Sequence, residues 1–277
     1  GEFCYFDSYQ DAPDSQPEAI GGYLPLSKVY SFNPVPDTLS ADKVQLVYGV
    51  QANLFTEYIP TPEHAEMMIY PRILALAEVA WSAPSVKNYD DFHVRALKEV
   101  EALKAEGYHP FELKNEIGNR PGADQPVQHL AVGKKVAYGP DAAYYPGYSA
   151  GGDSALVDGV IGGWTYGDRR WQGFIDKKRM DVTIDMEKET EIHSVGADFM
   201  QVCGPEVFMP SEVIISVSND GKEFTELKRM EHKVVKDDKV TFINFGWEGN
   251  AKARYIRYQA SSGEFGGFLF TDEIVVK

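Results

Sequence analysis

The sequence has little basic charge, few cysteines and no long apolar run. It carries 27 Lys and Arg residues against 42 Asp and Glu residues, a formal net charge of −15. Nucleic acids and anionic membrane surfaces are bound by basic protein surfaces, so this balance argues against both partners. No stretch of 18 consecutive apolar residues is present, so we expect no transmembrane helix and no membrane insertion.

The chain has two cysteines, Cys4 and Cys203, and neither belongs to a cluster of metal-ligating residues. One disulfide between them is possible in principle. Their neighbours have the pattern of buried strands, however, so we favour two buried, unreactive thiols.

The sequence shows no secretory signal, and it opens directly in a strand-like pattern, GEFCYFDSYQ. We therefore expect a chain cut from a longer protein, and its location stays unknown from this sequence. Its 277 residues are 43% hydrophobic and 25% charged, which leaves room for one large or two medium domains.

Residues 45–82 predict a strand, a loop and a helix in succession. The apolar run LVYGVQANLF at 46–55 predicts a strand buried on both faces. A turn with Pro60 and Pro62 follows, and residues 63–81 have apolar side chains at helical spacing. Glu57 stands where the strand gives way to the loop, the position at which ligands bind in barrels and open α/β folds. A solvated loop residue is the alternative interpretation of Glu57.

This stretch closely resembles the last strand and helix of the catalytic barrel of the family 20 β-N-acetylhexosaminidases. The family pattern is roughly G-x-Q-x-x-x-W-x-E followed by P-R-x-x-A-x-A-E-x-x-W-S. The matching residues here are Gly49, Gln51, Glu57, Pro71, Arg72, Ala75, Ala77, Glu78, Trp81 and Ser82. The sequence departs at Phe55, where the family usually has Trp, and Phe keeps an apolar surface without the indole N–H donor.

The resemblance extends to residues 2–9, EFCYFDSY, which alternate as a strand. The family carries Tyr-x-Asp at the end of the preceding barrel strand, matched here by Tyr5 and Asp7. It implies that Tyr5 contacts the acetamido group of the substrate, that Asp7 and Glu57 bind sugar hydroxyls, and that Phe55 faces the sugar. A core aromatic is the alternative interpretation of Tyr5.

The family cleaves terminal N-acetylglucosamine or N-acetylgalactosamine with retention, by attack of the substrate's own acetamide oxygen. An adjacent Asp-Glu pair orients the acetamide and protonates the leaving group. The one Asp-Glu pair here is Asp272-Glu273, far from the barrel segment. We therefore predict no catalytic residue, no cofactor for catalysis and no activity for this chain alone. Its partners would be N-acetylhexosamine-containing glycans and the missing N-terminal barrel portion of the parent protein.

The remainder of the first half predicts loops and one long helix. Residues 10–44 are rich in Pro and Gly, with one helical turn at 26–32, and residues 89–106 form an amphipathic helix that Gly107 ends. The Gly, Pro and Asn cluster at 115–127 predicts a linker. The resemblance implies that residues 1–114 hold an incomplete (β/α)8 barrel, its last two strand–helix units, which would expose apolar side chains.

Residues 128–277 have a different sequence pattern. Short segments rich in β-branched residues are separated by turn signals such as Asn219-Asp220-Gly221. Such spacing predicts an antiparallel β-sandwich. The segments LVDGVIGGW, RRWQGF, SVSNDGKEF and RYIRYQAS resemble a discoidin, or coagulation factor 5/8 type C, domain. The resemblance implies a galactose-binding-like jelly roll, which recurs as a carbohydrate-binding module beside bacterial glycosidases. The fold class expected for the whole chain is therefore multidomain, α/β plus all-β.

Two candidate sites lie in this second half. Members of the resembled fold often hold a structural Ca²⁺ between an early loop and the last strand, which here implies Asp158 and Glu273, with Asp153 and Asp272 nearby. Ordinary solvated acidic turns are the alternative.

The second candidate is an aromatic glycan site, since exposed rings stack on sugars and Arg binds hydroxyls. Its candidate residues are Trp164, Tyr166, Arg169 and Phe265. We expect Trp164 and Phe265 to be exposed and Trp171 to belong to the core.

Two classes of function remain open at this stage. One is the C-terminal portion of a β-N-acetylhexosaminidase, for which the resemblance implies a periplasmic or secreted bacterial protein. The alternative is a glycan-binding module without catalysis. A third interpretation is a protein-interaction domain, because discoidin-like domains also bind proteins.

Overall fold

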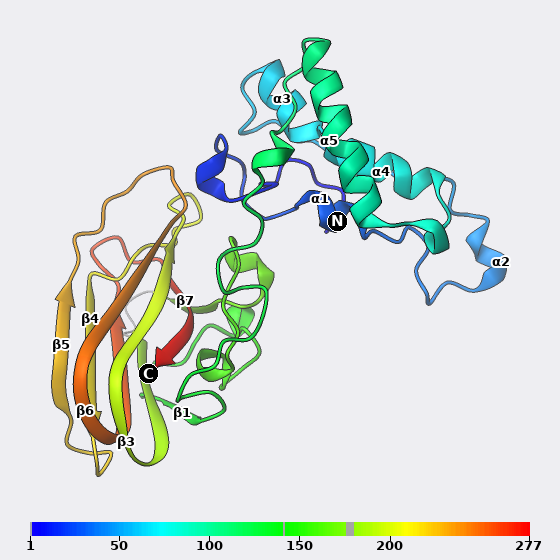
Figure 1. Cartoon of the computed structure of the whole chain (residues 1–277). Helices are drawn as coiled ribbons and strands as arrows, with labels where there is room; N and C mark the ends of the chain where they lie inside the picture. The colour runs from blue at the N-terminus through cyan, green and yellow to red at the C-terminus, as the bar shows by residue number, and fades with distance from the viewer. Residues whose placement is uncertain (1, 141, 176–179) are drawn as a thin grey trace. The chain divides into compact units, whose positions relative to one another are not determined.

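The computed structural model describes residues 2–140, 142–175 and 180–277, and it divides the chain into two compact units (Figure 1). Unit 1 comprises Gly1–Gly118 and unit 2 comprises Asn119–Lys277. The division falls within residues 115–127, the range in which the Gly and Pro cluster predicted a linker. No helix in the described part of the chain has the length and apolar character to cross a membrane.

Unit 1 is helical. Its α-helices are α1 (Leu26–Tyr30), α2 (Ala41–Val44), α3 (Pro62–Ile69), α4 (Arg72–Trp81) and α5 (Tyr89–Ala105), and its 3-10 turns are η1 (Pro13–Ser15), η2 (Pro84–Val86) and η3 (Leu113–Asn115). Its core combines α1, α4 and α5 with the first loop. The buried residues of this core are Phe6, Leu24, Leu26, Val29, Tyr30, Ala75, Leu76, Phe92, Ala96, Val100, Phe111 and Leu113.

The single helix predicted over 63–81 is broken into α3 and α4 at Tyr70 and Pro71. Pro71 has no N–H to donate and forces the preceding residue out of the helical region, and Tyr70 is extended with φ −96° and ψ 136°. The helical periodicity holds on both sides of the break, and Pro71 sets the boundary between the two helices.

The long helix predicted over 89–106 is confirmed as α5. The Asn88 side chain caps it by accepting from the Asp91 N–H at 3.1 Å. Phe92, Ala96 and Val100 are buried on one face, and Gly107 follows the helix in the left-handed region with φ +91°.

The two strands predicted in unit 1, over residues 2–9 and 46–55, are wrong. The described residues there form turns and isolated bridges. Tyr5 and Asn53 make one parallel bridge, in which the Phe6 N–H donates to the Asn53 carbonyl at 2.8 Å. The run at 46–55 is also not buried on both faces, since Tyr48 is 93% exposed. A strand is stabilised by a continuous ladder of hydrogen bonds, and one bridge keeps these segments side by side without one.

Unit 2 is an antiparallel sheet. Its strands are β1 (Lys135–Tyr138), β2 (Gln172–Ile175), β3 (Met180–Gln201), β4 (Glu212–Ser218), β5 (Thr225–Glu231), β6 (Thr241–Ser261) and β7 (Phe268–Val276). The strand order is β2-β7-β3-β6-β4-β5, with β1 paired to β3. Short 3-10 turns lie between β1 and β2, namely η4 (Pro146–Tyr148), η5 (Ala155–Val157) and η6 (Tyr166–Asp168). The all-β antiparallel class predicted for the second half is therefore correct.

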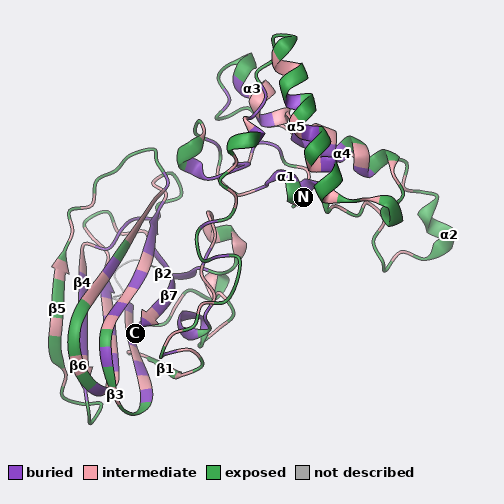
Figure 2. Ribbon diagram, viewed as in Figure 1, coloured by how far each residue is buried: buried purple, intermediate pink, exposed green. Residues whose placement is uncertain are grey.

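The long strands β3 and β6 carry the core of unit 2. They pair along most of their length, with register shifts between Asp185 and Thr190 and between Ile192 and Ser194. The first half of β3 also pairs with β1 and its second half with β7. Burial alternates along β3, as the period of a strand requires, and the inward side chains join one contiguous core (Figure 2).

The predicted turn at Asn219-Asp220-Gly221 connects β4 to β5. The Asp220 side chain accepts from the N–H groups of Lys222 at 2.8 Å and Glu223 at 3.0 Å, and Gly221 takes φ +71°. An Asp that bonds its own following backbone and a Gly that tolerates positive φ are the reasons the tripeptide turns the chain here.

Hydrogen bonds and ion pairs hold the residues on both sides of the division, each within its own unit. Asp11 accepts from the N–H groups of Ile117 at 2.8 Å and Gly118 at 2.9 Å, which holds the end of unit 1. Arg120 is buried in unit 2, where its guanidinium pairs with Asp272 and Asp198. The Gly- and Pro-rich composition of 115–127 therefore describes a structured segment more than a free tether.

Candidate functional sites

Two of the four sugar-contacting residues predicted in unit 1 lie together. The rings of Tyr5 and Phe55 stack with centroids 5.9 Å apart at 27°, and they are 40% and 51% exposed. The bridge between Tyr5 and Asn53 produces this contact, because Phe55 is then the diagonal neighbour of Tyr5 on the same side. Two exposed rings side by side form an apolar surface on which a sugar can stack.

Asp7 lies two residues after Tyr5 and is 6% exposed. Its Oδ1 atom is buried without a hydrogen-bond partner among the described residues. A buried carboxylate oxygen without a donor costs stability. Asp7 is the residue for which the resemblance implies a contact with sugar hydroxyls, and that role stays a prediction.

Arg72 fixes the backbone on both sides of Asp7. Its guanidinium donates to the carbonyls of Phe6 and Ser8, to Leu24 at 3.2 Å and to Met68 at 3.1 Å. Complete burial lowers the pKa of Arg72 to about 9, against the opposing effect of the Asp7 charge, so the side chain stays protonated at neutral pH. Arg72 therefore positions the backbone that carries Asp7. Arg72 belongs to the family motif, but the motif alone did not show this contact.

Glu57 is exposed in the turn that follows Phe55, where the Ile59 N–H donates to the Thr56 carbonyl at 3.2 Å. The structure thus brings Tyr5 and Phe55 together, buries Asp7 beside Arg72 and leaves Glu57 at the surface.

Glu78, another residue of the resemblance motif, joins three helices. Arg95 of α5 binds it with both terminal nitrogens, at 2.7 and 2.9 Å, and the Tyr30 hydroxyl of α1 donates to it at 2.9 Å. The Arg95 hydrogen bonds hold the pKa of Glu78 below its usual value. Glu78 is thus a structural residue in this chain.

In unit 2, the predicted glycan-binding residues fall into different aromatic clusters. Tyr166 stacks on Phe270 at 4.8 Å, whereas Trp164 packs edge-on against Phe242 at 5.6 Å. Trp164 was expected to be exposed and is only half-exposed, because Phe242 covers part of its ring.

Phe265 is exposed as predicted, and it lies beside Phe208 with the Lys236 ammonium 4.2 Å above its ring. Arg169 is exposed, with φ 67° in the left-handed region. Alternation and composition could mark these residues as aromatic or exposed. They could not show which rings pair with one another, since that depends on contacts between β6, β7 and the loops.

Trp171 is fully buried, as predicted, and it lies under a charge network that the sequence did not reveal. The Arg120 guanidinium sits 4.9 Å from the Trp171 ring and donates to Asp272 at 2.8 Å, and it also pairs with Asp198. Burial raises the pKa of Asp272 to about 6, against the opposing charge of Arg120. The Asp-Glu pair of this chain is therefore a buried structural feature.

Glu273 and Asp158, predicted to hold Ca²⁺, each have one carboxylate oxygen engaged by the protein. The Glu273 Oε1 atom is bound to His129 Nε2 at 2.7 Å and accepts from the Gly159 N–H at 2.8 Å, and Asp158 Oδ1 accepts from the Val160 N–H. Glu273 Oε2 is buried without a hydrogen-bond partner among the described residues. Ca²⁺ takes six to eight oxygen ligands, and the described residues contain no group of three or more His, Cys, Asp or Glu side chains that could hold a metal. The Ca²⁺ site stays a prediction.

Comparison with protein families agrees with this division of the chain. Residues 1–84 match the model of the glycosyl hydrolase family 20 catalytic domain, and residues 141–274 match the F5/8 type C domain. The chain thus matches part of a family 20 catalytic domain followed by an F5/8 type C domain, which confirms the resemblance inferred from the sequence.

Among individual relatives, a Beta-hexosaminidase of Porphyromonas gingivalis is 49% identical over 88 residues, which are 32% of this chain and 11% of the relative. A Beta-N-acetylhexosaminidase of Cellulomonas fimi is 32% identical over 100 residues, 36% of this chain and 20% of the relative. The chain therefore spans between a tenth and a fifth of the length of these two enzymes.

Among solved structures, chitosan-binding module 1 of a chitosanase/glucanase from Paenibacillus sp. IK-5 aligns with 55% of this chain and 99% of its own length, at 17% identity and a TM-score of 0.37.

Proposed function

We propose that this chain is the C-terminal portion of a bacterial β-N-acetylhexosaminidase that removes terminal N-acetylglucosamine or N-acetylgalactosamine. The observation that carries the proposal is the exposed Tyr5–Phe55 pair, with an Asp7 oxygen two residues further along the chain that is buried without a partner among the described residues. These groups lie within the segment that matches the family 20 catalytic domain. In this proposal Tyr5 meets the acetamido group, Phe55 packs on the sugar, and Asp7 and Glu57 accept from its hydroxyls.

The proposal assigns residues 1–114 to the end of an incomplete (β/α)8 barrel, with residues 115–127 as the connection to the β-sandwich at 128–277. Large apolar side chains on the surface of unit 1 support the incomplete barrel: Leu46 is 61% exposed, and Tyr48 and Trp81 are each 93% exposed. Such exposure is costly for a complete domain and is expected where further barrel segments would cover the surface.

The acid catalyst and the group that orients the acetamide belong, in this proposal, to the remainder of the barrel. The chain alone is then inactive, and it contributes sugar-binding residues to the enzyme. A periplasmic or secreted location would suit an enzyme that acts on glycans outside the cytoplasm.

A second candidate function is glycan binding by unit 2 without catalysis. The exposed Arg169 and Phe265, together with the half-exposed Trp164, favour it, because rings and guanidinium groups at a loop surface bind sugars.

Hydrolysis of a chromogenic N-acetylglucosaminide tests the proposal. The purified chain and its Glu57→Gln variant should both be inactive. The full-length parent protein should be active, and Asp7→Asn in it should lower kcat/KM by about 100-fold or more through loss of a charged hydrogen bond in the pocket.

The matched control is Asp14→Asn, an exposed carboxylate of the same loop, which should leave activity unchanged. Activity of the isolated chain, or an Asp7→Asn parent as active as the wild type, would refute the proposal.

A further inference from the structure

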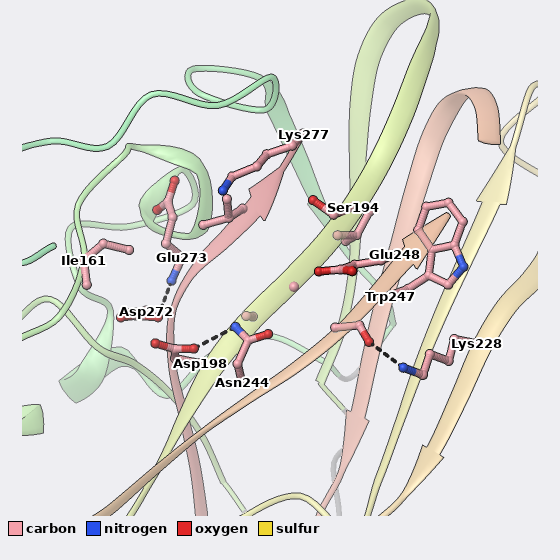
Figure 3. Close-up of a pocket in the computed structure, with 15 residues that line it drawn as sticks. Ile161, Ser194, Asp198, Lys228, Asn244, Trp247, Glu248, Asp272, Glu273 and Lys277 are labelled. Atoms are coloured by element: carbon pink, nitrogen blue, oxygen red, sulfur yellow. Dashed lines mark hydrogen bonds between the residues drawn. The ribbon is translucent and has the colours of Figure 1, made fainter. Parts of the chain in front are cut away.

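A polar groove of about 630 Å³ lies over β3, β6 and β7 of unit 2, and its lining includes none of the predicted glycan-binding residues Trp164, Tyr166, Arg169 and Phe265 (Figure 3). Its volume lies in the range of small-molecule sites. The groove residues used below are Ser194, Gly196, Asp198, Lys228, Asn244, Gly246, Glu248, Asp272, Glu273 and Lys277.

Two facing glycines form the floor of the groove. Gly196 of β3 is paired with Gly246 of β6, and the pairs on either side are Ser194 with Glu248 and Asp198 with Asn244. A Cβ atom at either glycine would come within 3.0 Å of Asn244 Oδ1. A Cβ atom at either position would therefore crowd the Asn244 amide, and a larger side chain there would project into the groove.

Asp198 and Asn244 form a fixed polar pair at one end of this floor (Figure 3). Asn244 Nδ2 donates to Asp198 Oδ1 at 2.7 Å, while Arg120, itself 5% exposed, pairs with the other Asp198 oxygen. This bond uses one of the hydrogen-bonding positions of the exposed Asn244 amide. A carboxylate beside an amide offers acceptors and a donor at the spacing of neighbouring hydroxyl groups.

Both signs of charge line the groove. Lys228, which donates to the Gly246 carbonyl at 2.9 Å, and Lys277 are the cations, and the carboxylates are Asp198, Glu248, Asp272 and Glu273. Arg120 pairs with two of these carboxylates, Asp198 and Asp272. A groove with this excess of carboxylates and many donors and acceptors favours an uncharged polyhydroxylated ligand over an anion. Its volume of about 630 Å³ suits more than one sugar ring.

We infer that this groove is a second carbohydrate-binding surface, which takes an unbranched, uncharged oligosaccharide across β7, β3 and β6. The choice of a carbohydrate as the ligand rests on the proposed glycan-binding function. The surface itself is separate from the predicted loop residues. Asp198 and Asn244 bind hydroxyl groups of the oligosaccharide, and the glycine floor lets the sugar lie close to the sheet.

Nuclear magnetic resonance of the whole chain locates the binding surface directly. The probe is the β-1,4-linked tetramer of N-acetylglucosamine, with the corresponding glucose tetramer as a second neutral probe. The amides of Gly196, Asn244 and Gly246 should shift with saturation by at least one probe. Shifts confined to residues 164–169 would overturn the groove and leave the proposed loop site standing. No shift with either probe would overturn both binding surfaces, while the hydrolysis experiment would still decide the enzymatic proposal.

A matched pair of asparagine variants tests the polar pair. Asn244→Ala should weaken binding about tenfold, the effect of about one ligand hydrogen bond. Asn250→Ala is the control, because Asn250 is an exposed residue of the same strand whose side chain makes a comparable 2.9 Å contact with His193 outside the groove. Equal affinities of these two variants would overturn the role of Asn244.

A steric variant keeps the test independent of that hydrogen bond. Ser194→Trp should fill the groove and abolish binding, whereas Thr190→Trp, also half-buried on β3 but outside the groove, should not. Circular dichroism establishes that each variant is folded. Full binding by a folded Ser194→Trp protein would overturn the inference.

Discussion

Unit 1 and unit 2 obtain their order from different interactions. Unit 2 has long antiparallel ladders between β3, β6 and β7, with a contiguous buried core beneath them. Unit 1 has helices joined by long loops, and the buried Arg72 links the Met68 carbonyl to the carbonyls of Phe6, Ser8 and Leu24, which lie 48 to 66 residues from Arg72 in sequence. A ladder spreads stability over many equivalent bonds, whereas unit 1 concentrates much of it in single polar side chains.

The same contrast appears at their surfaces. The most exposed aromatic side chains, Tyr48 and Trp81 at 93% each, belong to unit 1, while unit 2 buries Trp171 completely and Trp164 and Trp247 in part. In the proposed incomplete barrel, further barrel segments would cover the exposed side chains of unit 1.

Hydrogen exchange should show the largest difference between the units. Amides in the middle of β3 and β6 should exchange at least about 1,000-fold more slowly than those of residues 46–50, because the ladder opens only with the whole sheet. Mass spectrometry of the dilute monomer after deuterium labelling measures this. Equal protection of the two segments would mean that unit 1 is as stable as unit 2.

Arg72→Met should unfold unit 1 selectively. The change leaves the carbonyls of Phe6, Ser8 and Leu24 without their donor, and unpaired buried carbonyls cost about 3 kcal/mol or more in total. Arg95→Met is the matched control, because Arg95 is half-exposed in its ion pair with Glu78 and should cost about 1 kcal/mol or less. Urea denaturation followed by circular dichroism at 222 nm compares them. An Arg72→Met protein as stable as the Arg95→Met protein would show that the hydrogen bonds of Arg72 to the backbone carbonyls are dispensable.

How far the sequence predicted this molecule also differs between the units. In unit 2 the period of β-branched residues and the Asn219-Asp220-Gly221 turn indicated an antiparallel sheet correctly, because inward and outward positions of a strand alternate regardless of its partners. In unit 1 the apolar run at 46–55 predicted a strand, but apolar composition does not supply a partner, and one bridge at Asn53 is what forms. Strand formation there depends on residues outside the segment, which local pattern cannot show.

The sites follow the same division. Tyr5, Asp7 and Phe55 were identified by resemblance, and the structure places two of them in contact. The groove over β3 and β6 left no local signal, since Gly196 and Gly246 are 50 residues apart in sequence and meet only through strand register. A pair of glycines in two strands becomes informative only when the register is known.

Glu116 gives unit 1 a pH dependence of its own. Burial, and secondarily the charge of Asp11, raises the pKa of Glu116 to about 7. The folded state therefore favours the neutral form, so this contribution to stability is complete below about pH 4.5 and is lost as the pH rises through 7. Glu116→Gln mimics the neutral form and should raise the melting temperature of unit 1 by about 2–4 °C at pH 8.

At pH 4 the same substitution should change little, because Glu116 is then already neutral in both states. Glu106→Gln, an exposed residue beyond the end of α5, is the control and should have no effect at either pH. Differential scanning fluorimetry at both pH values measures the difference. A stabilisation by Glu116→Gln that is larger at pH 4 than at pH 8 would contradict the assignment.

We expect the smallest effect from calcium, which should leave the melting temperature of unit 2 unchanged. The Gly159 N–H and His129 bond to Glu273 Oε1, which leaves Oε2 as the oxygen of this residue open to a cation that takes six to eight oxygen ligands. If a calcium site existed, calcium at 100 times the Kd of that site would stabilise the folded state by about 2.7 kcal/mol. Melting of unit 2 in EDTA and in millimolar CaCl2 should therefore coincide. A higher melting temperature in calcium, lost in Glu273→Gln and retained in Glu264→Gln, would show that His129 and the Gly159 amide give way to the ion, and that unit 2 owes part of its stability to a ligand instead of to its ladders alone.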